Sequence, residues 1–132
     1  MIRLAASLAA LAIALPAYTW GPETNYAIHC QGCHLADGAE TPGKVPGLAG
    51  QVAIFLRTPD GRAYLGRVPG VASAPLPDAE LAALLNWTLR RFDAGHVPAD
   101  FVPYGAEEIG ALRSTPLVDV TRERARILEA SP

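Results

Sequence analysis

The sequence has no block of positive charge of the kind that captures nucleic acid. Its 11 basic and 13 acidic residues give a formal net charge of −2, and the longest basic run is the pair Arg90-Arg91. Electrostatic binding of nucleic acid is therefore excluded as the main activity. Charged residues make up only 18% of the 132 positions and apolar residues 50%. This balance excludes disorder throughout and predicts one compact domain with appendages.

The chain also lacks an N-terminal apolar run long enough to cross a membrane, which takes about 20 residues. The run covers only residues 4–15, with Arg3 before it and Ala17 shortly behind it. This layout predicts a secretory signal peptide over residues 1–17, and hence a periplasmic protein with no membrane span in its mature chain. Cleavage after Ala14, or retention of the segment as an anchor, stays open as an alternative.

Cysteine is scarce, and its placement is informative. The two cysteines are Cys30 and Cys33, and His34 follows at once. Two thiols at this spacing can add to the two vinyl groups of a haem, and the next imidazole can then bind the iron. A redox-active dithiol would instead follow a strand, and residues 18–29 show no strand-like alternation. A structural zinc site would need a distant fourth ligand, for which His96 is the candidate. The sequence favours haem and leaves the other two interpretations open.

Further motifs flank this string. They are Asp37-Gly38, the segment 45–50 (VPGLAG) and the segment 76–81 (LPDAEL). Together with residues 26–34 (YAIHCQGCH), they resemble the class I cytochrome c family over about residues 21–93. The resemblance implies a small all-α domain around one haem c, joined by thioethers to Cys30 and Cys33, with His34 as the proximal iron ligand. It also implies that the carbonyl of Pro46 receives the free N–H of His34, a contact that orients a ligating ring.

The apolar pattern predicts one long helix from near Pro77 to near Gly95. Its stripe recurs at helical spacing and consists of Leu81, Leu84, Leu85, Leu89 and Phe92. The resemblance implies that this helix crosses the one carrying Cys30, with Tyr26 and Trp87 near the crossing. Glycine and proline, 12 of each, fall mostly between residues 38 and 77, where we expect ordered loop rather than long helix or strand.

We expect a haem domain over residues 18–95 and a C-terminal extension over residues 96–132. Residues 101–104 should be extended, residues 106–113 should form a short helix, and residues 118–130 should form a second, amphipathic one. The simplest role for this extension is a strap packed onto the domain. A more specific alternative is that the extension covers the distal side of the haem or docks a partner enzyme.

The sixth iron ligand is missing from its usual place. The resemblance puts a methionine just ahead of the last helix, where this chain has residues 68–75 (VPGVASAP), and its single methionine is Met1. His96 is a candidate distal ligand, whereas His29 adjoins Cys30 and is poorly placed to reach the opposite face. The third option is an open iron in an apolar pocket. The lesser candidates are Ser73, Lys44, Tyr64 and Tyr104.

No catalytic carboxylate or nucleophile constellation is visible, so we do not expect an enzyme. The resemblance implies an exported carrier of single electrons between periplasmic redox proteins, such as a dehydrogenase or a terminal oxidase. The alternative is a five-coordinate haem protein that binds or senses nitric oxide, carbon monoxide or oxygen. Weak peroxidase activity would accompany such an open iron.

Overall fold

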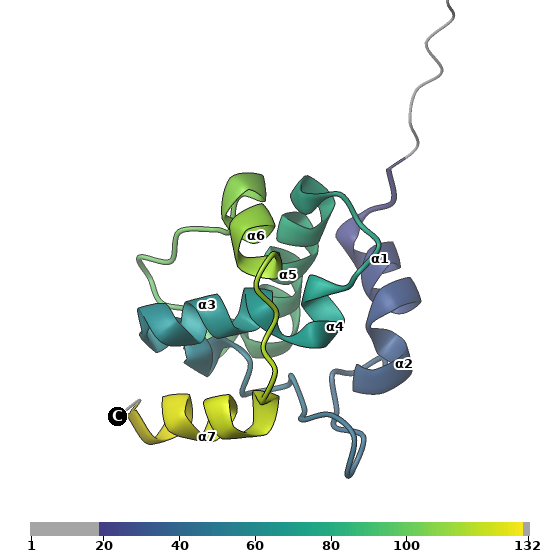
Figure 1. The fold of residues 1–132 in the computed structure, drawn as a ribbon. Coiled ribbons are helices and arrows are strands. Elements are labelled where there is room, and N and C mark those ends of the chain that lie inside the picture. Colours follow the sequence, from purple (N-terminus) through teal and green to yellow (C-terminus); the bar gives the residue numbers. More distant parts are fainter. Residues whose placement is uncertain (1–18, 131–132) are drawn as a thin grey trace, which may run out of the picture.

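The computed structural model describes residues 19–130. The predicted signal peptide, residues 1–17, therefore lies outside the described residues. The elements in chain order are α1 (Pro22–His29), α2 (Gln31–His34), η1 (Ala53–Arg57), α3 (Pro59–Arg67), α4 (Pro69–Ala72), α5 (Asp78–Asp93), η2 (Ala94–His96), α6 (Ala106–Arg113) and α7 (Val120–Ala130), where η marks a 3-10 helix (Figure 1). Within residues 19–130 no strand forms, and one isolated bridge joins Thr41 to Val45. The all-α prediction is confirmed.

The predicted long helix is present as α5, which begins one residue after Pro77 and continues into the single turn η2. It crosses α1, as the resemblance implied, and the Tyr26 ring lies 5.4 Å from the Trp87 ring and 4.9 Å from the Phe92 ring. The Tyr26 hydroxyl also donates a hydrogen bond of 2.7 Å to the carbonyl of Leu35. The crossing therefore fixes the segment that carries the two cysteines relative to α5.

The segment from residue 38 to 77 is more helical than its composition predicts. It contains η1, α3 and α4. Helix α3 begins at Pro59, a residue suited to the first helical position, and the Thr58 hydroxyl caps it by accepting the Gly61 amide at 3.0 Å. A Cβ on Gly61 would lie 2.1 Å from the carbonyl oxygen of Phe55. Gly61 thus permits close packing of α3 on η1, in a region where the glycine and proline content had favoured loop.

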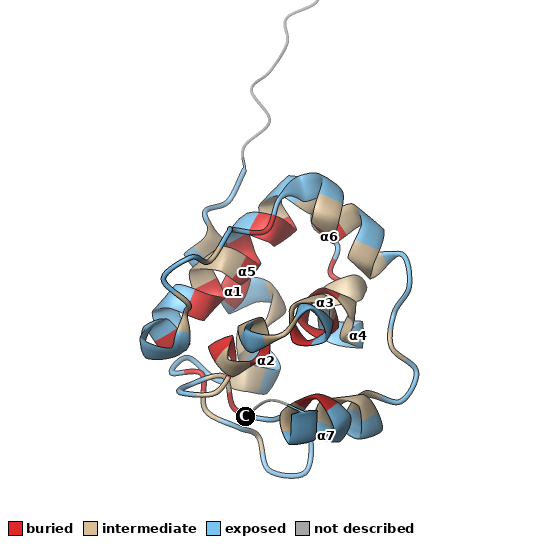
Figure 2. Ribbon diagram, turned by 90° about the vertical axis from the view of Figure 1, so that its left-hand side faces the viewer, coloured by how far each residue is buried: buried red, intermediate tan, exposed pale blue. Residues whose placement is uncertain are grey.

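The extension contains the two predicted helices. Helix α6 has the predicted bounds, and α7 begins at Val120 rather than at residue 118. Asp119 explains the later start, because its carboxylate accepts the Arg122 amide at 3.0 Å and so caps the helix. Ile109 of α6 and Ile127 of α7 are 0% and 1% exposed, and Figure 2 shows the buried part of α7 on the side that faces α3. The domain boundary at residue 95 stays a prediction.

In the part of the chain that the structure describes, no helix has both the length and the apolar character needed to cross a membrane.

Candidate functional site

A mostly apolar cavity of 640 Å³ opens beside the two cysteines. Five parts of the chain enclose it: the end of α1 with the turn that carries Cys30, Cys33 and His34, the loop that follows this turn, the run from η1 to α4, α5, and α7. A cavity of this size is in the range of cofactor sites, which are commonly about 300–1,000 Å³. It is therefore the place to test whether the predicted cofactor fits.

The wall formed by Cys30, Cys33, His34 and Pro46 is called the attachment wall below. The amides of Cys33 and His34 both donate to the Cys30 carbonyl, at 3.1 and 3.0 Å, so the three side chains belong to one helical turn. The two cysteines form no disulfide, and burial raises the pKa of the Cys30 thiol to about 11. A redox-active dithiol would need a lowered pKa.

The zinc hypothesis also lacks support. Among the residues that the structure describes, no three histidine, cysteine or acidic side chains come together as a metal site.

The His34 ring is oriented by the backbone. Its Nδ1 lies 3.1 Å from the carbonyl oxygen of Pro46, which has no proton to give, so Nδ1–H donates and Nε2 is the nitrogen left for a metal. Burial lowers the pKa of His34, an effect that the hydrogen bond to Pro46 opposes. The structure thus brings together His34 and Pro46, the pair that the family resemblance indicated.

Thr41 helps to hold the loop that carries Pro46 against the cysteine turn, a role that the sequence did not reveal. Its hydroxyl donates to the carbonyl of Cys33 at 2.5 Å, and its backbone pairs with Val45 in the isolated bridge. The Gly38 carbonyl accepts the amides of Leu48 and Ala49 at 2.7 and 3.1 Å. These bonds tie the loop to the cysteine turn and so hold the Pro46 carbonyl in place.

A second wall lies on α4 and the residues around it. We call it the α4 wall, and it consists of Val68, Pro69, Gly70, Val71 and Ala74. None of these side chains carries a nitrogen, sulfur or oxygen donor for iron. The exposed Ser73 belongs to the same segment but does not line the cavity.

Two of the lesser candidates do line the cavity. Tyr64 lies on the cavity side of α3 with its ring stacked on that of Phe55, 4.8 Å between centroids. Burial raises the pKa of the Tyr64 phenol, so it stays protonated at neutral pH. Lys44 also lies on the lining, and its side chain is exposed.

His96, the expected candidate for the distal ligand, does not line the cavity. Its Nδ1 lies 2.5 Å from one carboxylate oxygen of Asp93, and the other oxygen accepts the buried Ala53 amide at 2.7 Å. Tyr104 is likewise absent from the lining, and its hydroxyl donates to the Arg62 carbonyl at 2.7 Å. His29 does line the cavity, next to Cys30.

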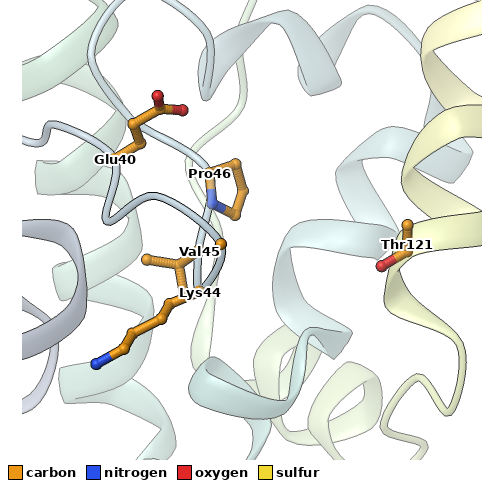
Figure 3. Close-up of a pocket in the computed structure, with 6 residues that line it drawn as sticks. Glu40, Lys44, Val45, Pro46 and Thr121 are labelled. Atoms are coloured by element: carbon orange, nitrogen blue, oxygen red, sulfur yellow. The ribbon is translucent and has the colours of Figure 1, made fainter.

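Helix α7 does more than pack on the outside of the domain, because it contributes residues to the cavity lining. Val120, Thr121 and Arg124 all border the cavity, and the Arg124 guanidinium donates to the Gln51 side chain at 3.3 Å. Figure 3 shows Thr121 on α7 facing the loop that carries Glu40, Lys44, Val45 and Pro46, across a smaller pocket of 320 Å³. The extension thus closes one side of the cavity.

Two cysteines and a backbone-oriented imidazole on one turn, facing an apolar cavity in an all-helical protein, fit a covalently attached haem. This combination defines a c-type cytochrome.

Two curated relatives point to the same class. Each is named cytochrome c-552, one from Thermus thermophilus and one from a specified strain of that species. Both are 35% identical over 118 residues, which cover 74% of this chain and 90% and 80% of the relatives. No protein-family model matches the chain. The chain belongs to the class I cytochrome c family. It is an electron-transfer protein with one covalently bound haem c and redox partners, and not an enzyme.

Proposed function

We propose that the protein carries single electrons between periplasmic redox proteins, such as an exported dehydrogenase and a terminal oxidase. The haem would be attached through thioethers to Cys30 and Cys33, with His34 as the proximal ligand. The observation that carries this assignment is the attachment wall, where both thiols and the His34 ring border one apolar cavity. The expected signal peptide over residues 1–17 supports export.

The bound haem supplies a reversible one-electron change at its iron. The Pro46 carbonyl fixes the His34 ring through Nδ1, and such a contact raises the donor strength of the other ring nitrogen. The apolar side chains of the α4 wall and of α5 exclude water from the cavity. Burial of this kind tunes the potential of a haem, so these residues adjust the energy at which the electron moves.

A second candidate function is binding of small gaseous ligands such as carbon monoxide. The observation that favours it is the chemistry of the α4 wall, which offers no donor to the iron, while His96 is held by Asp93. We therefore propose an open iron. Such an iron would have a lower reduction potential than one with an axial methionine.

An absorption spectrum of the holoprotein tests both candidates. The oxidised protein is reduced, and the spectrum is recorded before and after addition of carbon monoxide. Reduced bands that shift with the gas support an open iron, and sharp bands that do not change indicate a sixth ligand from the protein. His96→Ala is the matched variant, and it should leave every spectrum unchanged.

The attachment is tested separately by mass spectrometry of the denatured protein. Wild type should retain the mass of the haem, because thioether bonds survive denaturation. Cys33→Ser should form at most one thioether and fold poorly, because the core is built around the cofactor. A fully folded, colourless Cys33→Ser protein would contradict the assignment of the site.

A further inference from the structure

Arg113, at the end of α6, links the extension to the α4 wall. Its guanidinium donates to the backbone carbonyls of Ala72, the last residue of α4, and of Ala74 and Leu76 just behind it. It also forms an ion pair of 3.0 Å with Asp78, at the start of α5. One planar group with several donors in fixed directions therefore holds the whole turn between α4 and α5.

The surroundings of Arg113 allow little adjustment. Its side chain is 19% exposed, and α6 lies so close to α3 that a Cβ on Gly66 would come within 2.7 Å of the Leu112 side chain. Gly110 lies on α6, and a Cβ on this residue would lie 2.6 Å from the Asp78 carboxylate at the start of α5. These two glycines let α6 approach closely enough for Arg113 to reach the carbonyls.

The turn needs such a support for a chemical reason. Its residues, together with α4, form a wall of the cavity but contribute no side chain that can bond to iron from the cavity lining. A metal bond therefore does not anchor this segment. Its internal bonds are local ones, such as the amides of Ala74 and Leu76 to the carbonyls of Val71 and Ala74 at 3.1 and 2.8 Å.

We propose that Arg113 is a positioning residue that holds the α4 wall in place and thereby limits the entry of small ligands into the haem cavity. This role rests on the proposed open iron. Arg113 does not line the cavity, so it acts through the backbone of the turn. Hydrogen bonds from a charged donor are about twice as strong as neutral ones, and several of them converge here.

The test uses the holoprotein and three variants. Arg113→Ala removes all the contacts, whereas Arg113→Lys keeps the charge but loses the planar fork. Arg126→Ala is the matched control, since Arg126 also belongs to the extension but bonds to Asp60 and Glu123 on the surface. Hydrogen exchange reports on residues 73–76. The association rate of carbon monoxide with the reduced protein, after flash photolysis, reports on access.

We expect exchange at residues 73–76 to rise by about tenfold in Arg113→Ala, as for the loss of one charge-assisted hydrogen bond. The association rate should rise several-fold, Arg113→Lys should lie between, and Arg126→Ala should match wild type. Should Arg113→Ala fail to fold, the same two measurements on Arg113→Lys test the proposal.

The proposal is overturned if either measurement is the same in the Arg113 variants as in wild type. In that case the wild type still binds carbon monoxide, and the open iron stands. A wild-type protein that ignores the gas would contradict the open iron and the access role together.

Discussion

Replacing Asp93 by alanine would remove a carboxylate that two partners share at the end of α5. Asp93 is 4% exposed and accepts the amide of Ala53, itself 0% exposed, at 2.7 Å. An unpaired buried amide costs about 1–3 kcal/mol. The pair with the partly exposed His96 adds at most about 1 kcal/mol. The expected loss is therefore about 1–4 kcal/mol, or about 4–14 °C in Tm for a chain of this length.

Thermal melts of the holoprotein, followed by the haem absorbance and by far-UV circular dichroism, measure this loss. His96→Ala is the control, because it removes the pair but leaves the buried amide bonded, and it should lower Tm by no more than a few degrees. Both variants should keep the wild-type spectrum in each oxidation state. A spectral change in His96→Ala, or a larger drop in Tm than in Asp93→Ala, would refute the structural role assigned to this pair.

Three further predictions concern packing and pH. Gly61→Ala would place a methyl group 2.1 Å from a backbone oxygen that cannot move aside, so chemical denaturation should show a loss of about 3 kcal/mol or more; Gly95→Ala, which meets nothing within 4 Å, should be nearly neutral. Gly66→Ala meets the movable Leu112 side chain instead, and the double variant with Leu112→Ala should cost less than the sum of the two single changes. Burial raises the pKa of Tyr104 above its usual value of 10.0, so its contribution to stability is complete below about pH 10 and is lost as the pH rises further, because the unfolded chain ionises first. Tyr104→Phe should therefore flatten the decline of Tm above pH 10, and an unchanged slope would show that burial of this phenol does not control alkaline unfolding.

The sequence predicted the elements whose signals are local. Helix α5 has a long apolar stripe with acidic residues in its first turn and basic residues in its last, and α6 has the bounds that the pattern indicated. Helix α3 was missed because the glycine and proline content of residues 38–77 favoured loop, whereas Gly61 and Gly66 serve close packing against Phe55 and Leu112, which no local pattern reveals. Composition alone therefore underestimated the helix content of residues 38–77.

The residues of the candidate site likewise fall into those that a local motif reveals and those that only the fold reveals. Cys30, Cys33 and His34 form a contiguous motif, so the sequence alone located them, and the resemblance added Pro46. The bond from Thr41 to the Cys33 carbonyl depends on the path of the intervening loop, which no short motif encodes. The position of His96 likewise depends on how the chain turns after α5, and the Asp93 carboxylate decides it.

The cavity is assembled from segments that are far apart in the chain, with the cysteine turn on one side and α7 on another (Figure 1). Contacts at such separation cost loop-closure entropy and tend to form after local ones. A protein that lacks α7 would keep the attachment wall but would admit water beside Gln51 and Phe55, which Arg124 now covers. Haem potentials respond to the polarity of their surroundings. With the haem bound in this cavity as proposed, α7 would limit the water that reaches the haem through the residues it contributes to the lining, and would thereby influence the potential at which the electron is exchanged.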